Sequence, residues 1–104
     1  MAEPIRVLLV DDQSLVRSGF HMLIDSEDDM AVVGEASNGA EALEKLRTIE
    51  VDVALMDIRM PVMDGVETTR RIAASSLPTR VMILTTFDLD EYVYACLLYT
   101  SPSP

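Results

Sequence analysis

The sequence predicts an α/β fold, a doubly wound parallel sheet with helices on both faces. Short apolar runs, which are typical of strands, alternate with segments whose apolar residues recur at helical spacing. The runs are continuously apolar, which is typical of strands that are buried on both sides. The chain has 104 residues, 49% of them apolar and 25% charged, which is enough for one domain and too few for two. We therefore expect one domain with right-handed crossover connections.

Four segments have the length and composition of strands. Their apolar and β-branched residues favour extended structure with both faces covered. The second of the four contains Gly34, which weakens a strand interior, so we expect this strand near an edge of the sheet. The expected strands are residues 5–10, 30–36, 51–56 and 80–85.

Helical segments are expected between these strands. Ser14 and Asn38 can cap the first and second helices, because their side chains can accept from free backbone N–H groups. Asp64 with Glu67 three residues later has the pattern of a capping box and opens the third. A fourth helix is expected near Asp88, so the order is β-α-β-α-β-α-β-α. The apolar face of the first helix is expected to contain Val16, Phe20, Leu23 and Ile24.

The charge balance excludes several classes of partner for this segment. With 18 acidic and 8 basic residues, the net charge of −10 repels nucleic-acid phosphates and anionic lipid. No apolar run approaches the roughly 18 residues that a membrane span requires, so we expect a cytoplasmic protein without membrane contact. Cys96 is the single cysteine, which excludes an internal disulfide.

Polar residues follow three of the expected strands where each strand ends. Asp11 and Asp12 follow the first, Asp57 the third, and Thr85 and Thr86 the fourth. Taken singly, each is also compatible with a loop start or a helix cap. However, the carboxyl ends of parallel strands meet at one edge of a sheet, where crowded carboxylates repel one another unless a cation lies among them. Magnesium suits such oxygen ligands, and one carboxylate could then act as a nucleophile toward phosphorus.

Three motifs, "VLLVDD", "LMDIRMPVMDG" and "VMILTTFD", together resemble the receiver domain of bacterial two-component response regulators. The resemblance covers about residues 5–94 and implies a flavodoxin-like (CheY-like) fold. It implies that Asp57 is the phosphoacceptor for a sensor histidine kinase. It also implies that Asp11, Asp12, Asp57 and the backbone carbonyl of Arg59 hold Mg²⁺, and that Thr85 is the switch residue.

The stretches "DDQSLVR", "VGEASNGAEAL" and "LTTFDLDEYV" resemble the NarL/FixJ (LuxR-type) subfamily. Its members control transcription through a C-terminal helix-turn-helix, which this sequence does not contain, so DNA contact and homodimerisation on phosphorylation are expected of a parent protein. The resemblance implies signalling and, as chemistry, at most self-phosphorylation and self-dephosphorylation. Two alternatives stay open. One is a stand-alone receiver, and the other is a magnesium-dependent phosphohydrolase of the haloacid dehalogenase group, which would carry Asp where this sequence has Arg59.

The sequence departs from the receiver pattern near its end. Receivers carry a lysine after a fifth strand, whereas the single lysine here, Lys45, lies on the expected second helix. The residues "CLLYTSPSP" fit neither helix nor strand, because each proline removes a backbone donor. We therefore expect a receiver domain at 1–95, truncated before the fifth strand, with a non-native or disordered tail at 96–104. The fourth strand would then be an exposed apolar edge that promotes association.

Two residues of the receiver pattern bear on the lifetime of the phosphoryl group. In receivers, the positions two residues after the acceptor and two after the switch threonine flank the path of the hydrolytic water. Here they are Arg59 and Phe87, a long cation and a bulky ring. One hypothesis is that they shield the site and slow self-dephosphorylation, and the alternative is that both are solvated loop residues.

Overall fold

The α/β architecture expected from the sequence is confirmed by a computed structural model, which describes residues 3–58, 60 and 62–84. The described strands form one parallel sheet in the order β2-β1-β3-β4. The fourth helix expected near Asp88 and the tail at 96–104 lie outside the described residues. The elements are β1 (Ile5–Val10), α1 (Ser14–Asp25), β2 (Met30–Ala36), α2 (Gly39–Leu46), β3 (Val53–Asp57), α3 (Gly65–Ala74) and β4 (Arg80–Leu84).

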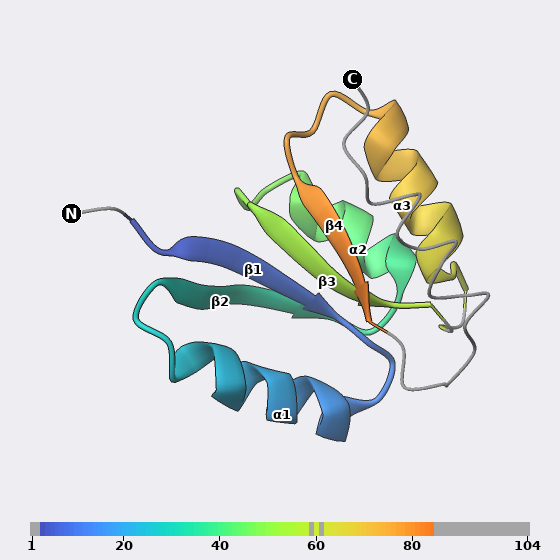
Figure 1. Ribbon diagram of the computed structural model, residues 1–104. Helices are drawn as coiled ribbons and strands as arrows, with labels where there is room; N and C mark the ends of the chain where they lie inside the picture. The colour runs from blue at the N-terminus through green and yellow to red at the C-terminus, as the bar shows by residue number, and fades with distance from the viewer. Residues whose placement is uncertain (1–2, 59, 61, 85–104) are drawn as a thin grey trace.

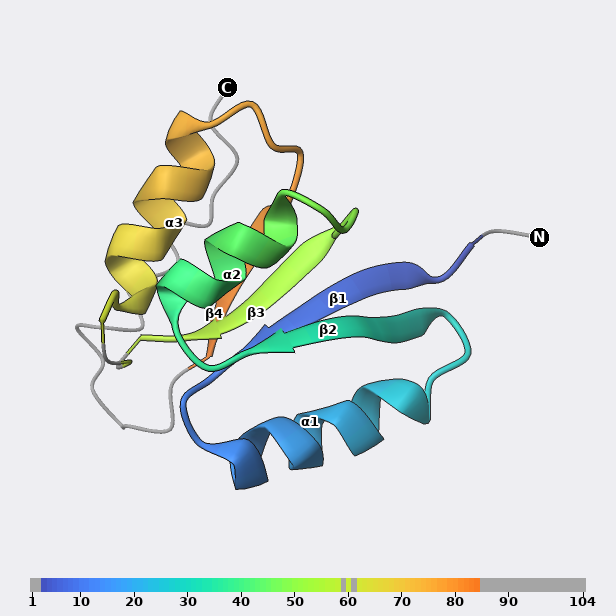
Figure 2. The same ribbon diagram turned by 180° about the vertical axis from the view of Figure 1, so that it is seen from behind.

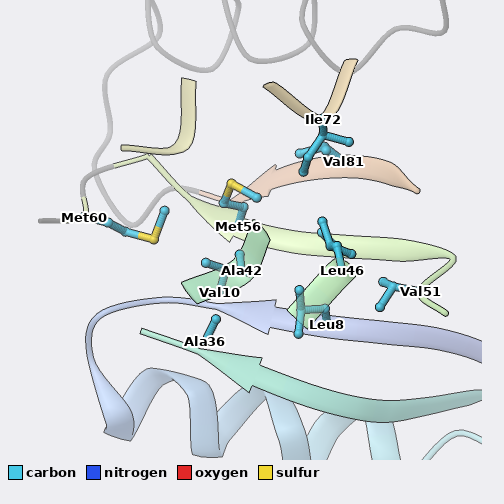
Figure 3. Close-up of a cluster of buried hydrophobic side chains, with 11 residues drawn as sticks. Leu8, Val10, Ala36, Ala42, Leu46, Val51, Met56, Met60, Ile72 and Val81 are labelled. Carbon is cyan, nitrogen blue, oxygen red and sulfur yellow. The ribbon is translucent and has the colours of Figure 1, made fainter. Parts of the chain in front are cut away.

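Helices cover both faces of the sheet. Helix α1 lies on one face, whereas α2 and α3 lie on the other (Figures 1 and 2). In β1, Leu8 and Val10 belong to the buried cluster on the side of α2 and α3 (Figure 3), and Val7 and Leu9 pack with Ile24 of α1. Successive strand residues point to opposite faces, so burial of both faces explains why β1 is continuously apolar. None of the described helices is long and apolar enough to cross a membrane.

Strand β2 lies at one end of the described sheet, as its weaker sequence predicts. The pairing of β1 with β2 passes from Val7–Val32 to Leu8–Gly34, so the register shifts by one residue at a bulge. A Cβ atom at Gly34 would lie 3.2 Å from Cδ1 of Leu8, which shows how closely the two strands approach there. Strand β4 lies at the other end of this order, and the association expected of that edge stays a prediction.

Two of the expected helix caps are confirmed. The Oδ1 atom of Asn38 accepts from the backbone N–H of Glu41 at 2.8 Å, at the start of α2. At the start of α3, Oδ1 of Asp64 accepts from the N–H of Glu67, also at 2.8 Å. Both bonds satisfy N–H groups that the first turn of a helix leaves free.

The cap expected at Ser14 is wrong. Ser14 is the first residue of α1, and Gln13, at the N-cap, makes no side-chain capping bond. Instead, Oδ1 of Asp11 accepts from the N–H of Gln13 at 2.9 Å, so a carboxylate two residues upstream organises the entry into the helix. The sequence pattern pointed to the wrong residue because Asp11, Gln13 and Ser14 all stand near the helix start, and the backbone turn decides among them.

Strand β3 begins two residues later than expected and includes Asp57. Before it, Asp52 bonds to Arg6 of β1: its Oδ2 accepts from the backbone N–H at 2.8 Å and from Nε at 3.1 Å. The backbone N–H of Asp52 also donates to the Arg6 carbonyl, and the Asp52 carbonyl accepts from the N–H of Arg80 in β4. The amino ends of three strands are therefore tied together at Asp52.

Candidate functional site: an acidic cluster at the carboxyl edge of the sheet

Three carboxylates meet where β1 and β3 end. The two strands are parallel neighbours, with Val10 paired with Met56, so Asp11 and Asp57 stand at the same level of the sheet. One carboxylate oxygen from each of Asp11, Asp12 and Asp57 lies within 4.8 Å of the others. Of the five residues that the sequence suggests for the site, the structure brings these three together, whereas Arg59 and Thr85 lie outside the described residues.

The three carboxylates differ in exposure. Asp57 is only 9% exposed, Asp11 is half-buried and Asp12 is exposed. Burial raises the pKa of Asp11 most strongly, and the charge of Asp12 raises it further. The N–H of Gln13 and the charge of Arg17 lower that pKa in part. Asp57 therefore forms the buried side of the cluster and Asp12 its solvent side, and a cation among the three carboxylates would reduce the repulsion between them.

The geometry of the three carboxylates fits a divalent metal ion. Carboxylate oxygens bind Mg²⁺ or Ca²⁺ at about 2.0–2.6 Å, so two oxygens on one ion can be at most about 5 Å apart. The oxygens of this cluster satisfy that limit. All three donors are hard oxygen ligands, which exclude a preference for soft metals.

The turn after β3 holds the backbone of Asp57. The N–H of Gly65, the first residue of α3, donates to the carbonyl of Ile58 at 2.8 Å. A Cβ atom at Gly65 would lie closer than 3.0 Å to the Asp57 carbonyl oxygen and 3.0 Å from Cα of Ile58, so this close approach requires glycine. The second acidic residue of the motif, Asp64, has a different task from Asp57, because it caps α3.

Sequence reasoning missed Val62, which lies in the turn between β3 and α3, and the pair formed by Arg17 and Glu35. Val62 has a φ of 71°, which is unusual for a β-branched side chain, and its residue type gives no signal of it. Arg17 of α1 donates to the backbone carbonyl of Asp11 and, through Nε, to Oε1 of Glu35 at 2.9 Å. The signal for this pair is Glu35 itself, an acid in an otherwise apolar strand.

The comparison with protein families identifies this architecture. The family described as "Response regulator receiver domain" matches residues 7–100. The chain belongs to this family. Its parallel sheet, with acidic residues at the carboxyl ends of β1 and β3, is therefore a receiver domain.

Known relatives and solved structures agree with this assignment. The receiver domain is 44% identical over 92 residues to the uncharacterized transcriptional regulatory protein YxjL of Bacillus subtilis, covering 88% of this chain and 42% of YxjL. The signal receiver domain of NarL from Mycobacterium tuberculosis superimposes with a TM-score of 0.87 at 38% identity, covering 96% of this chain and 81% of that one. One chain of the crystal structure of the P1 domain of CheA3 in complex with CheY6 from R. sphaeroides superimposes with a TM-score of 0.79 at 33% identity. The match covers 94% of this chain and 78% of that chain. The chain spans about two-fifths of the length of the curated relatives it matches.

Proposed function

We propose that this receiver domain accepts a phosphoryl group on Asp57 from a sensor histidine kinase and thereby controls transcription through a DNA-binding domain of the parent protein. The observation that carries the proposal is the convergence of Asp11, Asp12 and Asp57 at the carboxyl edge of the sheet. The similarity to the transcriptional regulatory protein YxjL supports the output, and the similarity to the complex of CheA3 with CheY6 supports the partner.

Asp57 is suited to act as the nucleophile. It ends a strand that is hydrogen-bonded on both sides, and its carbonyl is packed against Gly65, so its backbone is held in place. A carboxylate oxygen of Asp57 attacks the phosphorus of phosphohistidine, the P–O bond forms as the P–N bond breaks, and the imidazole leaves with the electron pair and takes a proton from solvent. Positioning of the acceptor is therefore the main contribution of the chain.

Mg²⁺ is the proposed ion, with Asp11, Asp12, Asp57 and the backbone carbonyl of Arg59 as its protein ligands. When bound, it would neutralise charge on the phosphoryl oxygens. The carboxylate of Asp12 is exposed to solvent, and Thr85, which follows β4 in the sequence, is the proposed switch residue.

The lysine of the receiver pattern has no equivalent in the described site. The single lysine of the sequence, Lys45, lies in the last turn of α2. A Cβ atom at Gly34 in β2 would lie 3.9 Å from Cδ of Lys45, which places this side chain beside the middle of β2 rather than at the acidic cluster. We therefore expect this chain to bind Mg²⁺ and to accept phosphoryl groups slowly.

The proposal is tested by labelling the chain with acetyl phosphate in Mg²⁺ and measuring intact mass. We expect one acid-labile phosphoryl group, lost in Asp57→Asn and retained in Asp64→Asn. The second variant is a matched control, since it removes a nearby carboxylate while asparagine can still cap α3. Labelling that persists in Asp57→Asn would refute the site, and steady release of phosphate with turnover would favour the phosphohydrolase alternative.

A further inference from the structure

We propose that Arg17, held by Glu35, is a positioning residue that fixes the loop between β1 and α1 so that Asp11 and Asp12 face Asp57. The inference rests on the proposed function, because it concerns how the metal ligands of that site are placed. It adds a role for two residues that lie outside the acidic cluster.

Arg17 connects three segments of the chain. It belongs to α1, its Nε donates to Oε1 of Glu35 in β2 at 2.9 Å, and its Nη1 donates to the backbone carbonyl of Asp11 in the loop. Its side chain is only 18% exposed, so these bonds are protected from much of the competition with water. The planar guanidinium can serve two acceptors at a fixed separation, which the flexible ammonium group of a lysine does less well.

Glu35 is itself held from two sides. Oε1 accepts from Arg17, and Oε2 lies 2.8 Å from Nδ1 of His21, which is also on α1. These two bonds lower the pKa of Glu35, so its carboxylate stays charged and keeps its bond to Arg17 near neutral pH. The carboxylate therefore gives Arg17 a fixed anchor on the sheet.

The backbone of Asp11 is fixed at both of its polar groups. Its N–H donates to the carbonyl of Ala36 at 3.0 Å, and its carbonyl accepts from Arg17. Its Oδ1 also accepts from the N–H of Gln13. Glu35 and Ala36 are neighbours at the end of β2. Ala36 bonds to the backbone of Asp11 directly, and Glu35 acts on Asp11 through Arg17. We infer that the pair Arg17–Glu35, together with the bonds to Ala36 and Gln13, orients Asp11 and so places Asp12 after it.

Arg17 also lies close to the acceptor. A cavity of about 20 Å³ is lined by Asp11, Arg17 and Asp57, among other residues. A cation in this place repels a metal ion, so by charge alone its removal should strengthen metal binding. If Arg17 acts by position, its removal should weaken metal binding, and the two explanations predict opposite signs.

The test compares Arg17→Ala and Glu35→Gln with Arg71→Ala. The control removes a salt bridge of the same kind and nearly the same length, from Nε of Arg71 to Oε2 of Glu67 at 3.0 Å. This salt bridge lies on the exposed surface of α3. Mg²⁺ affinity is measured by titration calorimetry at a temperature where circular dichroism shows each variant folded. Hydrogen exchange of the Asp11 and Gln13 amides is measured by NMR without metal.

We expect Arg17→Ala to raise the Kd for Mg²⁺ about tenfold, as is typical when a residue that orients metal ligands is lost. Glu35→Gln should act in the same direction with a smaller effect, and Arg71→Ala should leave Kd unchanged. Exchange of the Asp11 and Gln13 amides should accelerate in Arg17→Ala and, to a smaller extent, in Glu35→Gln, and it should stay unchanged in Arg71→Ala. An unchanged or lower Kd in Arg17→Ala, or an equal rise in Arg71→Ala, would overturn the inference.

The two readouts separate this inference from the proposed function. If the unsubstituted chain binds no Mg²⁺, the proposed function fails, and the amide exchange still decides whether Arg17 orders the loop. If Arg17→Ala does not fold, Glu35→Gln decides, since it keeps the guanidinium and removes the charge that anchors it. In that case, unchanged exchange and unchanged Kd in Glu35→Gln would overturn the role of the pair.

Discussion

Replacement of Gly65 by alanine should destabilise the fold by disturbing the end of β3, the strand that contains Asp57. A Cβ atom there would lie closer than 3.0 Å to the Asp57 carbonyl oxygen, 3.0 Å from Cα of Ile58 and 3.1 Å from the carbonyl carbon of Asp57. All three are backbone atoms, so no side-chain rotation can relieve the contact. Either α3 or the end of β3 must move.

The size of the effect follows from two opposing contributions. Overpacking in a tight site costs about 1–3 kcal/mol, whereas alanine gains up to about 1 kcal/mol over glycine in a helix. We expect a net loss of about 1–2 kcal/mol at Gly65. For a domain of this size, that corresponds to a decrease in Tm of roughly 5–15 °C.

Gly19→Ala is the matched control for this substitution. Gly19 lies within α1, and a Cβ atom there would have nothing within 4 Å, so only the gain in helix propensity remains. This variant should be about 1 kcal/mol more stable than the original chain. Thermal unfolding followed by circular dichroism measures both variants. A Gly65→Ala variant that is as stable as the original chain would refute the close approach of α3 to Asp57.

Further predictions concern the strained loop, the single imidazole and the contact of α2 with α3. Val62→Gly should increase the free energy of unfolding by about 0.5–1 kcal/mol, because relief of the positive φ of 71° outweighs the lost chain stiffness. Urea unfolding should therefore show a higher midpoint, and a lower midpoint would contradict this. His21 has a raised pKa because of its bond to Glu35, so its stabilisation should be full below the unfolded pKa and lost as the pH rises through the folded pKa. NMR titration of this imidazole and a flatter pH profile of stability in His21→Gln test it. Gly39→Ala should destabilise more than Gly65→Ala, since its Cβ atom would overlap Oγ1 of the buried Thr68, and calorimetry should show partial recovery when Thr68→Ala is added; additive losses would contradict the overlap.

The fold was predictable because the pattern of the sequence is local and consistent. Strands buried on both sides give continuous apolar runs such as residues 5–10, and Asn38 and Asp64 stand where a cap must stand. The convergence of the acids followed from topology, since parallel strands end at one edge. Each of these features depends on a period or on a short spacing, which one sequence displays.

The features that escaped prediction depend on contacts between distant segments. Arg17 and Glu35 are 18 positions apart, and nothing in their spacing relates them until α1 packs on β2. The start of β3 at Val53 depends on Asp52 turning to Arg6, and the entry into α1 depends on the turn at Asp11. Val62 is the opposite case, because its residue type argues against the conformation it adopts.

The bonds between Arg6 and Asp52 have a consequence for chemistry at the far end of the sheet. A strand that slips by one residue exchanges its two faces, and every residue along it then arrives at the wrong level. The bonds between Arg6 and Asp52 join β1 to the segment before β3 at their amino ends. They therefore fix the register of the two strands, which places Asp57 level with Asp11. The alignment of Asp57 with Asp11 therefore depends on contacts at the opposite end of the strands, and substitutions at Arg6 or Asp52 could disturb the acidic cluster without contacting it.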